Sequence, residues 1–310
     1  MSTIKKVIPK RLRHLTLGWM AKAGFFTGQV LPRKFGLKLF AFCGWIFYYF
    51  LPKDRKRTID NLKFIFGQEW CDKKIRVTAK KVFQSIGKNL FDAIKLNTLS
   101  AKKFDKVVSH DPLDSWEAAK ASGKGAIHVT AHLGCFEMLL HFFVRKGFEG
   151  VIVGRPFKNP AIDEVVRRMR SGPSIAYIDR SENPRTIVRL LREGRMMGVL
   201  VDQDTTKVEG VFADFLGHPA FTPSSAIKFA MKFNVPIIVS VTARLKNDKH
   251  HVFIGPQIER VDTGNFEDDL AATVRQINNA IGSYIRKFPE QWVWMHERWK
   301  TKQATEVIDK

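Results

Sequence analysis

The chain is short of cysteine and has no repetitive or low-complexity sequence. Its 310 residues include only three cysteines, Cys43, Cys71 and Cys135. Because they are odd in number and far apart, they suit neither a disulfide framework nor a zinc site, and they indicate a reducing compartment. We find no internal repeat, and 45% of the residues are hydrophobic. The composition is that of an ordinary folded protein with ample core.

Acidic side chains are also scarce. The chain has 52 Lys and Arg against 30 Asp and Glu, a net charge of +22. Such an excess implies an anionic partner, which could be nucleic acid, a membrane surface, or a phosphorylated or acidic substrate. The sequence has no zinc-finger spacing, no aromatic RNA-binding signature and no recognition-helix pattern, so we expect no nucleic-acid partner. Basic residues alternate with apolar ones near the N-terminus, and this pattern favours a membrane.

No apolar run near the N-terminus reaches the length of a membrane span. The uncharged aromatic run 39–51 follows Lys38 and is followed by Lys53, Arg55, Lys56 and Arg57. It is shorter than the roughly 20 residues that a spanning helix needs. Its basic flanks predict a helix that lies in the interface or enters one leaflet, with a buried core helix as the alternative. Further helices are expected at 12–31, 57–66 and 73–96, so residues 1–100 are interpreted as a helical membrane-anchoring region.

From Gly123 onward, strands and helices alternate. This order predicts an α/β fold with a mixed central sheet flanked by helices over residues 101–310, with ligands at the strand ends. The expected strands are 125–131, 150–154, 174–178, 197–201, 235–243 and 251–257. The expected helices are 115–121, 137–146, 160–171, 184–193, 223–233 and 267–287.

One stretch in this region carries the strongest chemical signal. A strand at 126–130 is followed by His132, by Gly134 as a turn residue, and by Glu137, where an apolar helix begins. A strand–turn–helix corner can bring the imidazole and the carboxylate together, and such a pair is the minimum apparatus of general-base catalysis. The alternative is a structural His–Glu hydrogen bond. Cys135 as a nucleophile is a weaker alternative, because a lone cysteine there is more often a small buried side chain.

Other strand ends carry polar side chains. Arg155 follows the second strand and is a candidate clamp for an anionic group, and Arg167, Arg168 and Arg170 follow on the next helix. For at least two of these three we favour a solvated helix face. Asp202, Gln203 and Asp204 follow the fourth strand, where carboxylates could bind a metal; without companion ligands at suitable spacing, no metal site is predicted.

Two aromatic segments complete the candidate site. The loop 209–217, which contains Phe215, could line an acyl pocket or simply cover the sheet edge, and Thr222 is expected to cap the following helix. Three tryptophans stand in eight residues near the C-terminus, beside His296 and Arg298. They indicate either a cluster that closes the core or a wall that faces the interface or the substrate.

These pieces together resemble the bacterial lipid A biosynthesis acyltransferases, the lauroyl/myristoyl acyltransferase family of the lysophospholipid acyltransferase superfamily. The resemblance covers nearly the whole chain. It rests on the H-x4-E motif His132 to Glu137, Arg155, Asp202-Gln203, the Phe212…Phe215-x-Gly217 loop, Thr222-Pro223 and the tail 289–300. Cys135-Phe136 departs from the Asn-Trp pair that is common there, which affects the expected pocket shape and not the catalytic pair.

The resemblance implies a glycerolipid acyltransferase-like fold and a specific reaction. An acyl chain would pass from acyl-carrier-protein, as co-substrate, to a hydroxyl of a phosphorylated lipid A precursor at the cytoplasmic face of the bacterial inner membrane. His132 would be the general base, oriented by Glu137, while Arg155, Asp202, Gln203, Phe215 and Arg298 would bind substrate. No metal or other cofactor is implied. The alternatives are another lipid acceptor (a lysophospholipid, a glycolipid or an aminolipid) and a non-catalytic basic membrane-binding protein of the same fold.

Overall fold

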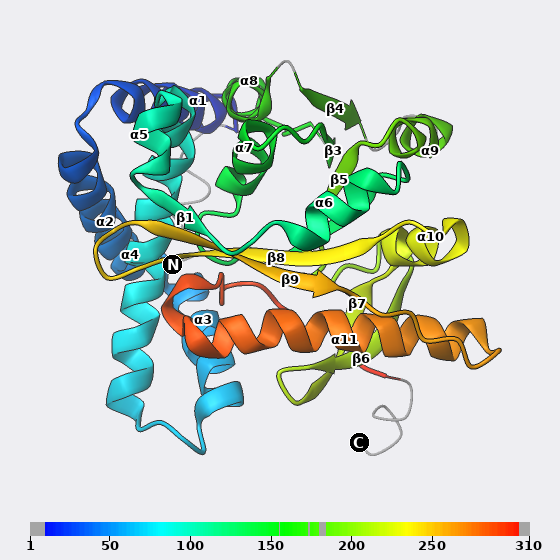
Figure 1. Cartoon of the computed structure of the whole chain (residues 1–310). Helices are drawn as coiled ribbons and strands as arrows, with labels where there is room; N and C mark the ends of the chain where they lie inside the picture. Colours follow the sequence, from blue (N-terminus) through cyan, green and yellow to red (C-terminus); the bar gives the residue numbers. More distant parts are fainter. Residues whose placement is uncertain (1–9, 155, 173, 180–183, 304–310) are drawn as a thin grey trace.

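A seven-stranded, mostly parallel sheet forms the centre of the molecule in a computed structural model that describes residues 10–154, 156–172, 174–179 and 184–303 (Figure 1). The strand order is β1-β9-β8-β2-β5-β3-β4, and all neighbours are parallel except β8 and β9. The strands are β1 (Val108–His110), β2 (Ala126–Thr130), β3 (Gly150–Gly154), β4 (Ile175–Asp179), β5 (Met196–Leu200), β8 (Ile237–Arg244) and β9 (His250–Gln257). The α/β prediction with a mixed central sheet is confirmed.

Helices cover both faces of this sheet. They are α5 (Ala101–Asp105), α6 (Asp114–Ala121), α7 (Glu137–Arg145), α8 (Pro160–Arg170), α9 (Pro184–Arg192), α10 (Ser225–Phe233) and α11 (Phe266–Lys287). Strand β2 is buried throughout because its alternating side chains serve two cores. Ile127 and Val129 belong to the core that contains α11, whereas Ala126 belongs to the core that contains Phe142 and Phe143 of α7.

The N-terminal part is helical and packs against the sheet domain. It consists of α1 (Lys10–Val30), α2 (Arg33–Phe50), α3 (Pro52–Phe66) and α4 (Asp72–Lys95), followed by the short helix η2 (Leu96–Thr98). Leu62 of α3 and Phe83 of α4 belong to the same hydrophobic core as Ile127 of β2. Helices α2 and α4 approach closely at glycines: a Cβ on Gly44 would lie 2.2 Å from the Phe83 carbonyl oxygen. The helices therefore share their core with the sheet.

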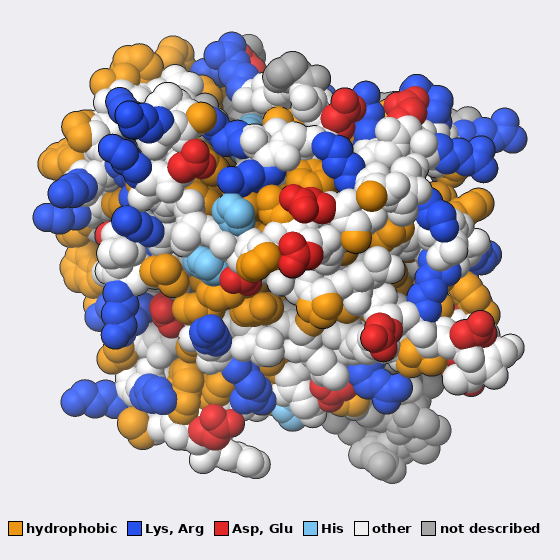
Figure 2. Space-filling model, viewed as in Figure 1, with side chains coloured by type: hydrophobic (Ala, Val, Ile, Leu, Met, Phe, Trp, Pro, Cys, Tyr) orange, Lys and Arg blue, Asp and Glu red, His pale blue; other side chains and the backbone are white. Residues whose placement is uncertain are grey.

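Large hydrophobic side chains remain exposed on α1 and α2. Figure 2 shows them interspersed with Lys and Arg over these helices, on the left of the view. The most exposed are Trp19 at 72%, Phe26 at 67% and Phe50 at 75%. Among the described residues, no single helix is apolar and long enough to cross a membrane; α2 and α3 together have the length and composition, with a 93° bend between them. Attachment of this region to a membrane stays a prediction.

Residues 210–223 form a two-stranded antiparallel hairpin, β6 (Gly210–Phe215) and β7 (His218–Pro223), where we expected a loop and a helix start. The prediction that Thr222 caps the next helix is wrong. Thr222 lies in β7 and is fully buried, and its hydroxyl accepts hydrogen bonds from Asn278 and Arg298. Helix α10 begins three residues later, at Ser225. The aromatic segment instead pairs its own backbone, with Phe212 opposite Phe221.

A buried ion cluster joins the N-terminal helices to the sheet. The fully buried carboxylate of Asp92 (α4) accepts hydrogen bonds from Arg33 at 2.7 and 2.8 Å, from Arg244 at 2.6 Å and from His250 at 2.8 Å. Burial alone would raise the pKa of Asp92, but the hydrogen bonds and charges of these three partners outweigh it and lower that pKa. The carboxylate is therefore ionised, and it links α2, α4, β8 and β9.

Candidate active site

His132 and Asp202 meet at the carboxyl ends of two neighbouring strands. In the parallel pair β2–β5, Thr130 stands opposite Leu200, and each functional residue lies two positions further along its chain. The imidazole Nδ1 of His132 is 2.9 Å from Oδ1 of Asp202, and the backbone N–H of His132 donates to Oδ2 at 2.8 Å. Strand register alone thus brings this pair together at the sheet edge where ligands bind in α/β folds.

Asp202 is fully buried, and each of its oxygens has a donor. Besides the two groups of His132, the indole N–H of Trp292 donates to Oδ2 at 2.7 Å. Burial would raise the pKa of Asp202, but the charge of His132 and the hydrogen bonds from His132 and Trp292 lower it to about 2. An ionised carboxylate can only accept, so Nδ1 of His132 carries a proton in both charge states of the ring, and in the neutral ring Nε2 keeps its lone pair. This is the tautomer that a general base requires.

Glu137 contacts a different partner from the one we expected. Its carboxylate forms a two-pronged ion pair with Arg170 at the end of α8, with Arg170 Nε donating to Oε2 at 2.9 Å and Nη2 donating to Oε1. Among the hydrogen bonds and ion pairs of the described residues, none joins His132 to Glu137. The predicted orienting contact is therefore corrected: Asp202 orients the imidazole, because the neighbouring strand places it closer than the first turn of α7 does. Whether His132 and Glu137 act in catalysis stays a prediction.

The turn between His132 and Glu137 is held tightly against the C-terminal segment. Gly134 has φ +58°, and a Cβ there would lie 2.1 Å from the Thr242 carbonyl oxygen. Its N–H donates to the carbonyl of Gln291 at 3.0 Å, and Leu133 forms a bridge with Trp292. Only glycine fits both the backbone angle and the space. The turn therefore has one available position, which fixes the imidazole relative to Asp202.

Gln203 and His296 complete the polar surroundings of the imidazole. The side-chain nitrogen of Gln203 lies 3.0 Å from Nε2 of His132 and 3.3 Å from Nδ1, so the amide lies close against the ring. The same nitrogen is 2.9 Å from Nε2 of His296. The sequence places His296 in the tryptophan-rich C-terminal segment, but its approach to His132 depends on the fold.

Arg298 and Phe215 lie together in the core. The Arg298 guanidinium donates to the Phe221 carbonyl at 2.5 Å and to the Thr222 hydroxyl at 2.7 Å, and it lies 4.4 Å from the ring centre of Phe215. Both side chains are fully buried. They support the hairpin β6–β7 from within, and their predicted contact with substrate is not tested. Arg155, the predicted anion clamp, lies outside the described residues.

The remaining candidates have structural surroundings. Cys135 is buried, and burial, followed by the charge of Asp92, raises the pKa of its thiol, so it lacks the thiolate that a nucleophile needs. Burial lowers the pKa of His128 to about 4 and leaves it neutral. Asp204 accepts two hydrogen bonds from Thr301. No group of three or more His, Cys, Asp and Glu side chains suited to a metal occurs in the part of the chain that the structure describes.

Arg167 and Arg168 form exposed ion pairs with acids one turn earlier on α8, at 2.7 Å each. This agrees with a solvated face for two of the three arginines. Arg170 differs from them because its side chain is only 21% exposed and turns inward to Glu137.

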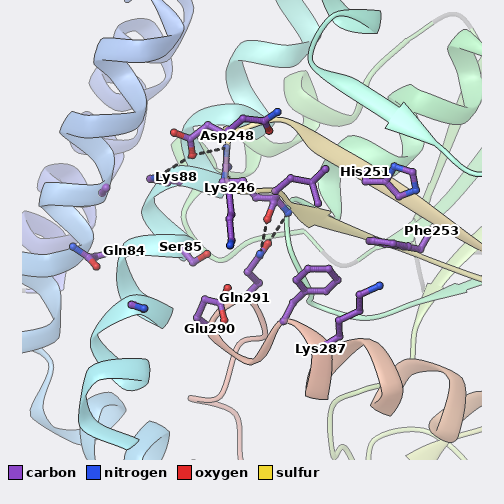
Figure 3. Close-up of a pocket in the computed structure, with 16 residues that line it drawn as sticks. Gln84, Ser85, Lys88, Lys246, Asp248, His251, Phe253, Lys287, Glu290 and Gln291 are labelled. Carbon is purple, nitrogen blue, oxygen red and sulfur yellow. Dashed lines mark hydrogen bonds and ion pairs between the residues drawn. The ribbon is translucent and has the colours of Figure 1, made fainter. Parts of the chain in front are cut away.

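A basic cavity of about 1080 Å³ lies between α4, the β8–β9 turn and the end of α11 (Figure 3). It was not predicted. Figure 3 shows Lys88, Lys246 and Lys287 around it, with Lys88 paired to Asp248 at 2.8 Å. Gln291 forms part of its wall and bonds reciprocally with the backbone of Arg244. His132 is not among the residues that line the cavity.

An imidazole held in the base tautomer by a buried carboxylate, at the strand ends of an α/β sheet, has the geometry that general-base catalysis requires. The sequence model of the bacterial lipid A biosynthesis acyltransferases matches residues 6–301. The chain therefore belongs to this acyltransferase family.

Individual relatives are distant but span most of the chain. A lipid A biosynthesis acyltransferase of Haemophilus influenzae is 25% identical over 263 residues, covering 83% of this chain and 79% of the relative. The lipid A biosynthesis palmitoleoyltransferase of Escherichia coli K12 is 25% identical over 268 residues, covering 83% and 82%. A phosphatidylinositol mannoside acyltransferase of Mycobacterium tuberculosis is 24% identical over 232 residues, covering 70% and 68%. These relatives thus include acyltransferases whose names give different lipid acceptors.

Proposed function

We propose that the protein transfers a fatty acyl chain from the thioester of acyl-carrier-protein to a hydroxyl of a lipid A precursor. Membership of the acyltransferase family supports the reaction class. The observation that carries the assignment of the base is the bond between Nδ1 of His132 and the ionised, buried Asp202, which leaves Nε2 able to accept a proton.

The proposed reaction is direct transfer with His132 as general base. Nε2 takes the proton of the acceptor hydroxyl while the oxygen attacks the thioester carbonyl, forming the new C–O bond and a tetrahedral oxyanion. The oxyanion collapses, the C–S bond breaks, and the leaving thiolate takes the proton back from His132. Asp202 holds the ring and stabilises the imidazolium that forms between these steps.

Positive side chains suit the anionic substrates of this reaction. The net charge of +22 favours a phosphorylated acceptor, an acidic carrier protein and an anionic membrane surface. Glu137 holds Arg170 by two parallel bonds at the end of α8, and a guanidinium fixed in this way can receive a phosphate with its free donors. We assign Glu137 the role of positioning Arg170. Arg155 keeps its proposed role as an anion clamp.

The exposed aromatic face of α1 and α2 supports attachment to the cytoplasmic face of the inner membrane. Trp45, Phe47 and Phe50 are 36–75% exposed and are followed by the basic start of α3. Aromatic and basic side chains together favour the interface of an anionic bilayer. In a flotation assay, wild type should rise with vesicles containing anionic phospholipid, and the Phe50→Glu variant should rise less. Equal flotation of both would contradict the assignment of this face.

The transfer assay uses radiolabelled acyl-carrier-protein thioester, a lipid A precursor and purified protein. We expect transfer by wild type, its loss in His132→Ala, and normal transfer in His110→Gln, which changes an imidazole on the far edge strand β1. Near-normal transfer by a folded His132→Ala variant would refute the base. No transfer to this acceptor, with transfer to a mannosylated phospholipid, would reassign the acceptor; the relative from Mycobacterium tuberculosis motivates that second substrate.

A non-catalytic membrane-binding protein is the other alternative. Membership of the acyltransferase family and the intact His132–Asp202 pair argue against it, because the pair leaves Nε2 of His132 able to accept a proton. Vesicle binding without transfer to any of the lipid acceptors would favour this alternative.

A further inference from the structure

We propose that Gln203 donates a hydrogen bond to the oxyanion formed during acyl transfer, and that His296 positions its amide for this task. The inference rests on the proposed function, because it requires His132 to be the general base. It is carried by one juxtaposition: a single amide nitrogen lies 3.0 Å from Nε2 of His132 and 2.9 Å from Nε2 of His296.

The donors and acceptors of the three side chains decide the direction of the hydrogen bonds from Gln203 to His132 and His296. Nδ1 of His132 gives its proton to Asp202, so its Nε2 can only accept. A carboxamide nitrogen carries two N–H groups, which matches the two imidazole nitrogens that it faces. At rest, one N–H of Gln203 thus contacts the base and the other contacts His296.

His296 is suited to the accepting role. Burial lowers its pKa and favours the neutral ring. A protonated His132 lowers this pKa further, and the other charged groups that act on it are Asp202 and Arg57. Its segment is fixed from α3, where Asn61 donates to the carbonyl of His296 at 2.8 Å and to that of Trp294 at 2.7 Å. The acceptor for the second N–H is therefore held in place by the fold.

The reaction itself releases the first N–H. Nε2 of His132 has one lone pair, which cannot accept from Gln203 and from the acceptor hydroxyl together. When the hydroxyl binds and then transfers its proton, Gln203 loses this partner at the moment when negative charge appears on the thioester oxygen. A donor about 3 Å from the base nitrogen is within reach of that oxygen, since the attacked carbon must lie next to the same hydroxyl. His296 keeps the amide from turning away.

The kinetic test uses Gln203→Met, which keeps the length of the side chain and removes the donor. Loss of one oxyanion donor lowers kcat by about 10²- to 10³-fold, and we expect this loss with little change in KM for either substrate. The control is Gln257→Met, at the exposed C-terminal end of β9. Gln203→Met activity within about threefold of wild type would overturn the proposal.

The positioning role of His296 has its own test. His296→Phe should lower kcat, His296→Gln should recover part of the loss because its carbonyl oxygen can accept, and the double variant Gln203→Met/His296→Phe should be no slower than Gln203→Met alone. Multiplied losses in the double variant would show that His296 does not act through Gln203.

A titration followed by NMR separates this inference from the proposed function. A donor to the neutral imidazole disfavours protonation, so Gln203→Met should raise the pKa of His296. An unchanged pKa of His296 would show that Gln203 does not donate the hydrogen bond on which the inference depends, whatever the activity. Absence of transfer by wild type with every acceptor would instead reject the proposed function, while an active wild type with unaffected Gln203 variants would reject this inference alone.

Discussion

Replacing Asp202 by Asn tests the site most directly, because the change removes one charge and almost no volume. Three donors converge on the Asp202 carboxylate: two at Oδ2, from Trp292 and the backbone of His132, and one at Oδ1, from Nδ1 of His132. An Asn oxygen would turn to the position with two donors. Its NH2 group would then face Nδ1, which must become the acceptor, and the proton of the ring would move to Nε2.

The expected loss in kcat is about 10²- to 10⁴-fold, the range that follows from losing a general base or its correct tautomer in other enzymes. Single-turnover transfer of radiolabelled acyl groups measures the chemical step, and near-ultraviolet circular dichroism of the tryptophans reports whether the variant stays folded. A folded Asp202→Asn variant within threefold of wild type, beside an inactive Glu137→Gln variant, would refute the orientation by Asp202.

The same substitution has a signature in stability. The pKa of Asp202 falls from 3.8 to about 2 on folding, which corresponds to about 2 kcal/mol. Because the folded pKa is the lower one, this stabilisation is present above pH about 4 and is lost as the pH falls towards 2. Urea unfolding should therefore show wild type losing this contribution between these values, and Asp202→Asn lacking it. The same pH dependence in both proteins would contradict the assignment.

Three further predictions concern the supports of the site. Glu137→Gln should raise the KM for the phosphorylated acceptor about tenfold and change kcat less than Asp202→Asn does, because Arg170 loses its fixed position. If Glu137 acted on the imidazole instead, steady-state kinetics would show a large loss in kcat and little change in KM. Arg298→Met should lower the free energy of unfolding by about 2–4 kcal/mol, because the buried Phe221 carbonyl and Thr222 hydroxyl of β7 lose their donor. A loss below about 0.5 kcal/mol in urea unfolding would contradict this structural role. Gly134→Ala should abolish transfer and destabilise the fold by about 2–4 kcal/mol, because the new Cβ would lie 2.1 Å from the Thr242 carbonyl oxygen and the backbone φ is +58°. Unaltered transfer and thermal unfolding would show that the turn can move.

The alternating region was predictable because its elements are locally encoded. Apolar runs bounded by glycine and charged residues gave the strands β2, β3, β4 and β5 to within about one residue at each end. The hairpin β6–β7 was missed because its strands mix glycine, proline and aromatic residues and have no clear alternation. The three-residue strand β1 is too short for any periodic signal.

The partner of the imidazole was not predictable from spacing. Glu137 is five residues from His132 and Asp202 is seventy, so the local sequence favours Glu137. Which carboxylate contacts His132 depends on the strand order, which places β5 directly beside β2 and aligns Thr130 with Leu200. Nothing in either strand encodes that adjacency. The place of Asp202 at a strand end makes it a candidate site residue, but its contact with His132 follows only from the strand order.

The cluster around Asp92 makes the N-terminal helices and the sheet one cooperative unit. A fragment beginning at residue 101 would lose Asp92 and Arg33, and with them the 2.6 Å ion pair between Asp92 and the guanidinium of Arg244. It would also expose the part of the core that Leu62 and Phe83 fill. Arg244 bonds Gln291, whose carbonyl receives the Gly134 N–H, so the disturbance would reach the turn beside His132. We therefore expect that the helices that carry the exposed aromatic face cannot be removed without disturbing the turn that holds His132.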